Sequence, residues 1–192
     1  MTPVNLDALL PVAEAFRALG IEYYIGGSLA SSVHGRARST ADVDLAANVK
    51  VDHIPALVAR LESDYYIDAL MIREAIHSGQ SFNLIHLPTA YKVDVFPMGE
   101  RPFEQSARRR VVQSLLPPLE DLLFPVASAE DTILYKLEWY RMGGETSERQ
   151  WSDILGVIQV QADALDRAYL QHWAAELNVG NLLERALRDA VI

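Results

Sequence analysis

Residues 21–49 read IEYYIGGSLASSVHGRARSTADVDLAANV, and they indicate how this chain is built. An aromatic and β-branched run, Ile21–Ile25, ends in Gly26-Gly27-Ser28, and a second apolar run extends over Val43–Val49. Short apolar runs bounded by turn residues are typical of strands. We therefore expect a strand, a glycine turn and a short helix, followed by another strand.

Two aspartates stand one residue apart at the start of the second strand. Residues i and i+2 of a strand point to the same face, so Asp42 and Asp44 project side by side, opposite the apolar Val43 and Leu45. Neighbouring carboxylates repel each other unless one is protonated or a cation lies between them, and Mg²⁺ or Mn²⁺ prefers hard oxygen ligands. The pair is a candidate metal site, although such pairs also occur as solvated strand residues.

A third carboxylate repeats the pattern farther along the chain. Asp94 stands between Val93 and Val95 in a run that we expect to be a strand. Three carboxylates from two neighbouring strands suffice to hold two metal ions about 4 Å apart. Phosphoryl or nucleotidyl transfer is the natural task of such a site.

The glycine turn supplies features that suit phosphate binding. Gly26 and Gly27 let the backbone approach a ligand closely, and a helix that begins at Ser28 offers free N–H groups and a positive dipole end. The Ser28 hydroxyl can donate to a β- or γ-phosphate. We expect the phosphates of a nucleotide to bind at this turn.

The remaining pattern predicts an α+β fold: a mixed sheet with flanking helices, followed by a C-terminal helical bundle. Residues 1–125 form the expected catalytic domain, and residues 126–192 a helical region packed on it. In the first part we expect helices over 5–19, 52–61 (with Asp52 as cap), 69–76 and 103–113, and a hairpin over 82–87 and 91–96. After Ser128, which resembles a helix cap, we expect helices over 129–142, 148–160, 166–177 and 181–190.

Composition limits the class of protein. The 192 residues are 50% hydrophobic and include no cysteine, which favours a folded cytoplasmic protein and excludes disulfide scaffolds and thiolate metal sites. Met1 to Leu10 lacks the features of a signal peptide, and no apolar run approaches the roughly 18 residues of a membrane span, so we expect no membrane association.

Charge argues against a broad nucleic-acid surface, because the net charge is −9. The one dense basic patch is Arg108-Arg109-Arg110, with Arg101 nearby. We interpret it as a solvated helix face rather than as a polyanion-binding surface.

The quoted motifs resemble those of the DNA polymerase beta-type nucleotidyltransferase superfamily, in which a glycine-serine turn is followed by an Asp-x-Asp and a third Asp. The matching residues are Gly26-Gly27-Ser28, Arg38 to Leu45 and Val93-Asp94-Val95. Within this superfamily, the chain is most similar to small bacterial nucleotidyltransferases of the kind that includes abortive-infection and toxin-antitoxin enzymes. The resemblance covers about residues 20 to 97.

The resemblance implies a role for each carboxylate. Asp42 and Asp44 would hold two Mg²⁺ or Mn²⁺ ions with a nucleoside triphosphate (NTP). Asp94 would help to ligate one ion and deprotonate the acceptor hydroxyl. Arg38 and Thr40 match an Arg-x-Thr that often precedes the Asp pair in such enzymes, which implies nucleotide binding together with Gly26, Gly27 and Ser28. For Arg38, an ion pair with an aspartate that anchors the loop is the alternative.

Lys136 is the remaining candidate, because family members carry a lysine on the first helix of the tail that approaches the triphosphate. Here Lys136 shares a stripe with Ile133, Leu137 and Tyr140, where a charge is awkward unless it snorkels or meets an anion. Phosphate contact and snorkelling both remain open.

Other polar and aromatic residues give weaker signals. Asp153 follows Arg149 by four residues, so we expect an ion pair between them. One of Tyr23 and Tyr24 is a candidate for the pocket wall, with strand packing as the safer interpretation. Aromatic residues of the tail occur at helical spacing and are expected in the bundle core rather than as a base-stacking surface: Trp139, Tyr140, Trp151, Tyr169 and Trp173.

We conclude from the sequence that the chain is a metal-dependent nucleotidyltransferase that moves a nucleoside monophosphate (NMP) from an NTP such as ATP to an acceptor hydroxyl, with release of pyrophosphate. An RNA end such as that of a tRNA, a protein hydroxyl and a small molecule are all compatible acceptors. The alternative is a non-catalytic protein of a toxin-antitoxin-like pair that binds NTP and metal, with a cognate antitoxin as partner.

Overall fold

The computed structural model describes residues 5–117, 119 and 121–190; positions 1–4, 118, 120, 191 and 192 lie outside the described residues. Among these described residues, seven strands form one mixed sheet in the order β3-β4-β5-β2-β1-β7-β6. The strands are β1 (Tyr23–Ile25), β2 (Asp42–Ala47), β3 (Tyr65–Tyr66), β4 (Phe82–His86), β5 (Tyr91–Pro97), β6 (Val112–Leu115) and β7 (Leu123–Val126).

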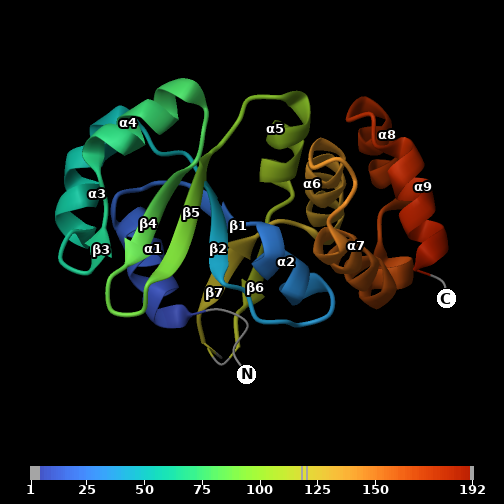
Figure 1. The fold of residues 1–192 in the computed structure, drawn as a ribbon, viewed down its shortest axis with the longest axis horizontal. Helices are drawn as coiled ribbons and strands as arrows, with labels where there is room; N and C mark the ends of the chain where they lie inside the picture. The colour runs from blue at the N-terminus through green and yellow to red at the C-terminus, as the bar shows by residue number, and fades with distance from the viewer. Residues whose placement is uncertain (1–4, 118, 120, 191–192) are drawn as a thin grey trace.

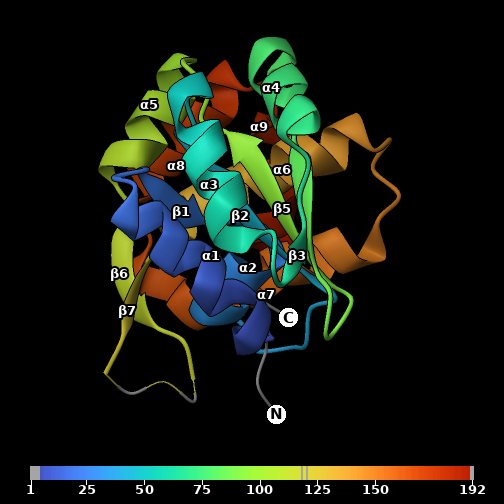
Figure 2. The same ribbon diagram turned by 90° about the vertical axis from the view of Figure 1, so that its left-hand side faces the viewer.

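Helices cover both faces of the sheet and then continue into a bundle at one side (Figure 1). The α-helices are α1 (Leu6–Ala18), α2 (Gly27–His34), α3 (Ile54–Leu61), α4 (Ala69–Ser78), α5 (Pro102–Arg109), α6 (Ala129–Met142), α7 (Glu148–Gln161), α8 (Arg167–Glu176) and α9 (Gly180–Asp189). Two 3-10 turns, η1 (Val51–His53) and η2 (Ala162–Ala164), precede α3 and α8. Helices α1, α3 and α4 lie on one side of the sheet, as Figure 2 shows, and α2 and α6–α9 lie on the other.

The expected mixed sheet with flanking helices and a helical tail is confirmed. Two hydrophobic clusters stabilise it. One joins the sheet to α1, α3 and α4, with Val43 and Leu45 fully buried, and the other joins α6–α9 to Phe103 of α5. Polar and apolar residues alternate along β2, and this alternation orients the strand. Its apolar face packs in the first cluster, while Asp42 and Asp44 stay only half-buried on the opposite face. The proposed boundary near residue 126 stays a prediction.

Local signals account for the helices that position the site. The Ser128 hydroxyl accepts a hydrogen bond from the Asp131 N–H (3.1 Å) and donates to its carboxylate (2.6 Å), which begins α6 as expected. Gly79, with φ +67°, ends α4 in the left-handed conformation. Among the described residues, no helix is long and apolar enough to cross a membrane.

Some expected elements are wrong. The helix expected over 103–113 ends at Arg109, and the chain continues as the edge strand β6, which pairs antiparallel with β7. Asp52 does not cap a helix, because it lies inside η1 and α3 begins at Ile54. Strands β3 and β7 carry no pattern of their own, since each is short and is fixed by pairing with a neighbour in the sheet.

Candidate active site

Parallel pairing of β2 and β5 brings the three predicted carboxylates to one region of the sheet. In their register Asp44 lies beside Asp94, and Asp42 lies beside Lys92. Asp94 is buried, and Asp42 and Asp44 are partly exposed. The spacing of the motif therefore translates into a cluster of acidic residues on the face of the sheet that α2 and α6 also occupy.

The glycine turn packs directly onto Asp44. Gly26 N–H donates to the Asp44 carbonyl oxygen (2.9 Å), and Ser28 N–H donates to its carboxylate. Gly27 has φ +53°, and a Cβ at this position would overlap the Asp44 carboxylate. Glycine is thus required here both for the backbone conformation and for space.

The electrostatic environment of Asp44 favours a cation. Burial, followed by the negative charges of Asp42 and Asp94, raises the pKa of Asp44 to about 6, although Lys136 and the Ser28 N–H act in the opposite direction. A positive ion next to these carboxylates would relieve the repulsion, and their oxygens are the ligands that divalent cations such as Mg²⁺ prefer.

Asp94 is already engaged by a lysine. Its carboxylate accepts a salt bridge from Lys92 Nζ at 2.7 Å. Within the described part of the chain, no three His, Cys, Asp or Glu side chains are gathered closely enough to hold a metal ion between them. The donor chemistry of Asp42, Asp44 and Asp94 fits a divalent ion, and a shared site requires the Asp94 carboxylate to turn away from Lys92.

Arg38 and Lys136 converge on one carboxylate, that of Asp153 on α7. Arg38 donates from Nε (2.8 Å) and Nη2 (2.7 Å), and Lys136 Nζ donates at 2.9 Å. Arg38 Nη2 also donates to Ser28 Oγ (2.8 Å). These hydrogen bonds hold the pKa of Asp153 below its ordinary value although burial alone would raise it. The network ties α6 and α7 to the glycine turn.

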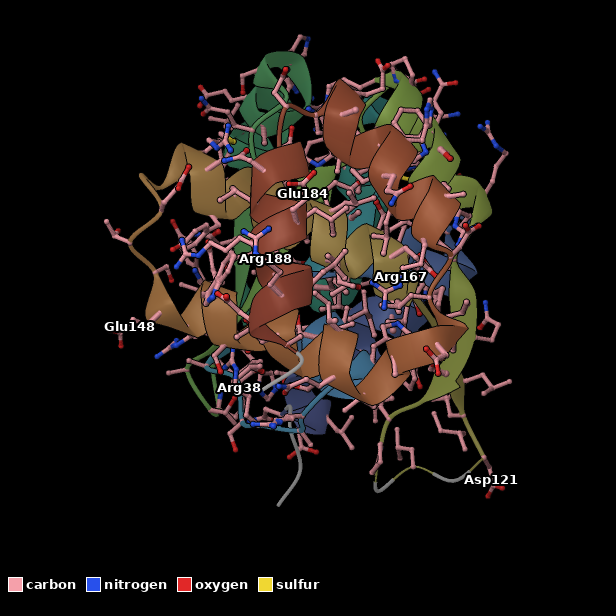
Figure 3. All side chains as sticks on the ribbon, turned by 90° about the vertical axis from the view of Figure 1, so that its right-hand side faces the viewer. Arg38, Asp121, Glu148, Arg167, Glu184 and Arg188 are labelled. Atoms are coloured by element: carbon pink, nitrogen blue, oxygen red, sulfur yellow. The ribbon has the colours of Figure 1, made fainter. Side chains whose placement is uncertain are left out.

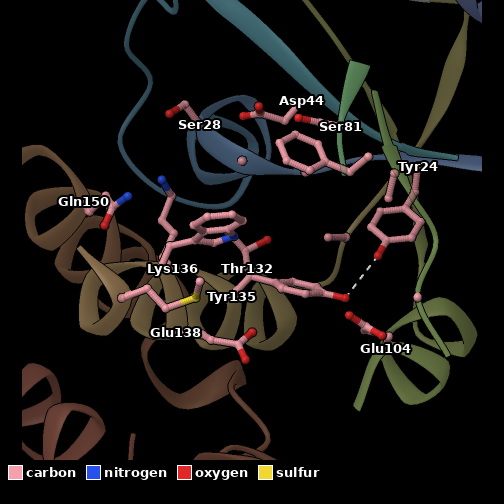
Figure 4. Close-up of a pocket in the computed structure, with 18 of the residues that line it drawn as sticks. Tyr24, Ser28, Asp44, Ser81, Glu104, Thr132, Tyr135, Lys136, Glu138 and Gln150 are labelled. Atoms are coloured by element: carbon pink, nitrogen blue, oxygen red, sulfur yellow. Dashed lines mark hydrogen bonds between the residues drawn. The ribbon is translucent and has the colours of Figure 1, made fainter. Parts of the chain in front are cut away.

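The expected pairing of Asp153 with Arg149 is wrong. Asp153 is buried and points to Lys136 and Arg38, which are distant in sequence, so a helical i, i+4 rule does not apply. The anion that Lys136 meets is Asp153, and Lys136 is only 7% exposed. Figure 4 shows its side chain extending from α6 toward Ser28 and Asp44.

A cleft of about 1020 Å³ opens between the sheet and α6 at this point. Its floor includes the glycine turn, Asp44 and Ala46, and one face of α6 forms its wall (Figure 4). Residues of that face occur at spacings of three and four: Thr132, Tyr135, Lys136, Trp139 and Met142. The volume lies at the upper end of the range for ligand-binding clefts, which is roughly 300–1,000 Å³.

The fold of the chain has counterparts among solved structures. The solution structure of the antibiotic-resistance factor ANT(2'')-Ia matches with a TM-score of 0.59 at 12% identity, over 96% of this chain and 97% of that one. A nucleotidyltransferase-like protein from Paracoccidioides brasiliensis matches with 0.58 at 19% identity, over 98% and 94%. The lincomycin-bound lincosamide antibiotic adenylyltransferase LnuA matches with 0.54 at 17% identity, over 82% and 99%.

The chain has the nucleotidyltransferase fold. Neither the protein-family models nor the curated proteins include a match to the sequence. At these identities the structural likeness establishes the fold, so the reaction has to be argued from the residues of the site.

Within the nucleotidyltransferase fold of this chain, Thr40 contacts Tyr91 of β5. Its hydroxyl is 3.0 Å from the Tyr91 hydroxyl, which also donates to the Asp42 carbonyl oxygen (2.9 Å). Thr40 does not line the cleft, whereas Gly26, Gly27, Ser28 and Lys136 do. Through Tyr91 of β5, Thr40 fixes the chain just before Asp42.

The basic patch is largely neutralised by acidic neighbours. Arg110 lies 3.1 Å from Glu130 and 4.0 Å above the Tyr169 ring, and Arg108 is 3.8 Å from Glu100. On the outer helices, Arg167, Glu184 and Arg188 mix both signs of charge (Figure 3). The expected solvated helix face holds for Arg109, which is exposed, whereas Arg108 and Arg110 are half-buried against acidic side chains.

Tyr24, one of the two candidates for the pocket wall, lines the cleft, and so do several residues that were not among the sequence candidates. Trp139 was expected in the bundle core, but it is 49% exposed and lines the cleft, so that expectation is wrong. Thr132 is buried and its hydroxyl has no hydrogen-bond partner among the described residues, while the Tyr24 and Tyr135 hydroxyls lie 3.2 Å apart. Thr132, Tyr135 and Trp139 lie within four residues of Lys136 on α6, and this helical spacing is the sequence signal that could have identified the cleft-facing side of the helix.

Replacement of Gly27 by Ala tests the close packing of the turn on Asp44. We expect Gly27→Ala to lower the free energy of unfolding by at least about 2 kcal/mol, since it adds a steric overlap to left-handed strain. Gly20→Ala is the matched control, because Gly20 has φ +66° but open space around its Cβ position. It should cost only about 1 kcal/mol. Equal losses in urea unfolding would contradict this packing.

Proposed function

We propose that this protein is a nucleotidyltransferase that moves an NMP from an NTP to the hydroxyl of a small-molecule acceptor and releases pyrophosphate. The observation that carries the proposal is the position of the Asp44 carboxylate, directly beneath the Gly26-Gly27-Ser28 turn and inside a cleft that Lys136 also lines. An anion-binding turn, a cation and an acidic cluster thus meet at one point. Because NTP is supplied in the cytoplasm, we propose that the protein acts there.

The triphosphate is proposed to bind at the N-terminus of α2. Backbone N–H groups and the helix dipole favour negative charge there, and the Asp44 carboxylate packs against Gly27 at the same helix end. Lys136 supplies a positive charge from the opposite wall, and Arg38 holds the Ser28 hydroxyl in place (2.8 Å). Thr40 acts indirectly in this proposal, by fixing the start of β2 through Tyr91.

Asp42 and Asp44 are proposed to hold divalent metal, Mg²⁺ or Mn²⁺, together with Asp94. When bound, such ions neutralise charge on the phosphates and on the leaving pyrophosphate. Burial and then the negative charges of Asp42 and Asp94 raise the pKa of Asp44, and a bound cation would offset both effects, which supports this assignment. We expect two metal ions to bind at this site together with the NTP.

Asp94 is proposed to take the proton of the acceptor hydroxyl. The acceptor oxygen forms a bond to the α-phosphorus, the bond from that phosphorus to the β-phosphate oxygen breaks, and pyrophosphate carries away the electron pair. The proton passes to a carboxylate oxygen of Asp94. Lys92 Nζ lies 2.7 Å from that carboxylate and releases it when the metal and the NTP bind.

A small acceptor is favoured over RNA by the charges around the cleft. Arg108 and Arg110 lie against acidic side chains, and Arg101 is shared between Glu104 and Glu138. A polyanion would meet these carboxylates without a basic track to follow. Two of the solved structures of this fold contain antibiotics or their products, lincomycin in LnuA and adenylyl-2''-tobramycin in ANT(2'')-Ia, which supports a small hydroxyl compound.

The test is label transfer with each α-labelled NTP, Mg²⁺ or Mn²⁺, and separate pools of hydroxyl-bearing small molecules, RNA and proteins. We expect label in the small-molecule pool with the wild type and at least about 100-fold less with Asp42→Asn, since loss of a metal ligand costs several kcal/mol of transition-state stabilisation. Label in RNA or protein instead would overturn the proposed acceptor. Bound NTP without transfer in any pool would favour a non-catalytic partner protein.

Metal removal gives a separate prediction. With EDTA in excess, nucleotidyl transfer should fall to background. It should return when Mg²⁺ or Mn²⁺ is added in excess of the chelator, because a divalent ion then neutralises the carboxylates around Asp44 again. Unchanged transfer in EDTA would contradict the metal assignment of Asp42 and Asp44.

A further inference from the structure

An aromatic wall lines the part of the cleft that the phosphate site leaves unassigned. It consists of Phe96 on β5 and Trp139 and Met142 on α6. The ring centroids of Phe96 and Trp139 lie 6.3 Å apart, with planes inclined at 66°. Trp139 is 49% exposed and Met142 is 70% exposed, so apolar surface faces an open cleft rather than a packed core.

The aromatic wall lies next to the proposed phosphate site on both sides of the cleft. On α6, Trp139 follows Lys136 by three residues, a helical rise of about 4.5 Å. On the sheet, Phe96 lies beside Ala46 and follows Asp94 by two residues, a distance of about 6.6 Å along the strand. The aromatic wall is therefore within reach of a group bonded to a phosphate at that site.

The acceptor and the nucleoside are expected on different sides of the α-phosphate. The cleft is lined by Asp44 but by neither Asp42 nor Asp94, whose carboxylate takes the acceptor proton in the proposed reaction. In-line attack places the acceptor beside Asp94 and the pyrophosphate opposite to it. The cleft toward Phe96 and Trp139 is then left for the nucleoside.

We propose that the aromatic wall binds the nucleobase of the NTP, with the base stacked on Trp139. The assignment rests on the proposed function, because it takes the triphosphate position from it. An exposed indole offers a π-face to any base, and Phe96 holds that indole in place through its edge contact. Trp139 is thus a determinant of NTP affinity rather than of phosphate binding.

The experiment compares ATP with inorganic tripolyphosphate, which has the same phosphates and no base, in calorimetric titrations with Mg²⁺. Trp139→Ala should weaken ATP binding about 5- to 100-fold, the range for loss of one stacked base, and should leave tripolyphosphate affinity within about twofold. Trp139→Phe should recover most of the ATP affinity because it keeps a ring. Tyr66→Leu, an exposed aromatic side chain on β3, is the control.

The outcomes separate this inference from the proposed function. If Trp139→Ala weakens both ligands equally, Trp139 supports the fold or the phosphate site, and base stacking is wrong. If ATP affinity is unchanged while only the KM of the acceptor rises, the wall binds the acceptor instead. A folded wild type that binds neither ligand contradicts the phosphate site itself. Wild-type binding of both ligands, with a loss confined to ATP in Trp139→Ala, supports the assignment.

Discussion

Replacing Asp44 with Asn is expected to abolish nucleotidyl transfer and at the same time to make the metal-free protein more stable at neutral pH. Activity should fall at least about 100-fold, because the variant loses a proposed metal ligand in the acidic cluster. The amide can still accept the hydrogen bond from the Ser28 N–H that the carboxylate now accepts. The same substitution is therefore expected to lower activity and to raise stability, whereas loss of a carboxylate that stabilises the fold would lower stability.

The stability effect follows from the raised pKa of Asp44, which burial and the neighbouring Asp42 and Asp94 shift from 3.8 to about 6. The folded protein holds this proton more tightly than the unfolded chain does. The protonated Asp44 carboxyl group contributes its full stabilisation below pH 3.8, and this stabilisation is lost as the pH rises through about 6. The loss approaches about 3 kcal/mol, and Asn avoids it.

Urea unfolding in EDTA between pH 4 and pH 8 measures this effect. The wild type should lose stability relative to Asp44→Asn over that interval, and the variant should be the more stable by about 1 to 3 kcal/mol at pH 7. Asp64→Asn, at an exposed position outside the cleft, is the control and should follow the wild type. Parallel curves for wild type and Asp44→Asn would contradict the crowded acidic cluster.

Replacing Asp153 with Ala is expected to be the most destabilising change in the site. The variant leaves Lys136, only 7% exposed, without its salt bridge and removes both hydrogen bonds from Arg38. Removing one partner of a buried pair typically costs 3–5 kcal/mol, because a charge stays buried and uncompensated. We expect about 3 kcal/mol here, since Arg38 can turn to solvent.

Thermal unfolding checks this expectation. A loss of about 3 kcal/mol in a chain of this length lowers Tm by about 6 to 12 °C. Asp163→Ala, at an exposed position in η2, should leave Tm unchanged. Lys136→Met should cost less than Asp153→Ala, because Asp153 keeps its two hydrogen bonds from Arg38. A Tm of Asp153→Ala equal to that of the wild type would contradict the network.

Features that depend on neighbouring residues were predictable from the sequence. Helix α6 has the expected bounds, Ala129–Met142, because Ser128 caps its start and Gly143 follows its end. The strand, turn and helix around Gly27 follow from local pattern in the same way. The side-by-side arrangement of Asp42 and Asp44 follows from the two-residue period of a strand.

Features that depend on distant residues were not predictable. Asp153 lies 115 positions from Arg38, so nothing in the sequence around it indicates that partner, and the local rule selected Arg149. The helix expected over 103–113 extends into the first two residues of β6, because the pairing of β6 with β7 is absent from the local pattern. Trp139 fits a core stripe by spacing, and only the position of β5 opposite α6 shows that it faces a cleft.

The central claim is that the cleft at the glycine turn transfers the α-phosphoryl part of an NTP. The most direct measurement incubates the protein with small-molecule acceptors and either α-labelled or γ-labelled ATP. The account predicts that label enters the acceptor from α-labelled ATP only, while γ-label appears in pyrophosphate. Transfer of the γ-label to the acceptor, or hydrolysis of ATP without any labelled acceptor, would contradict it.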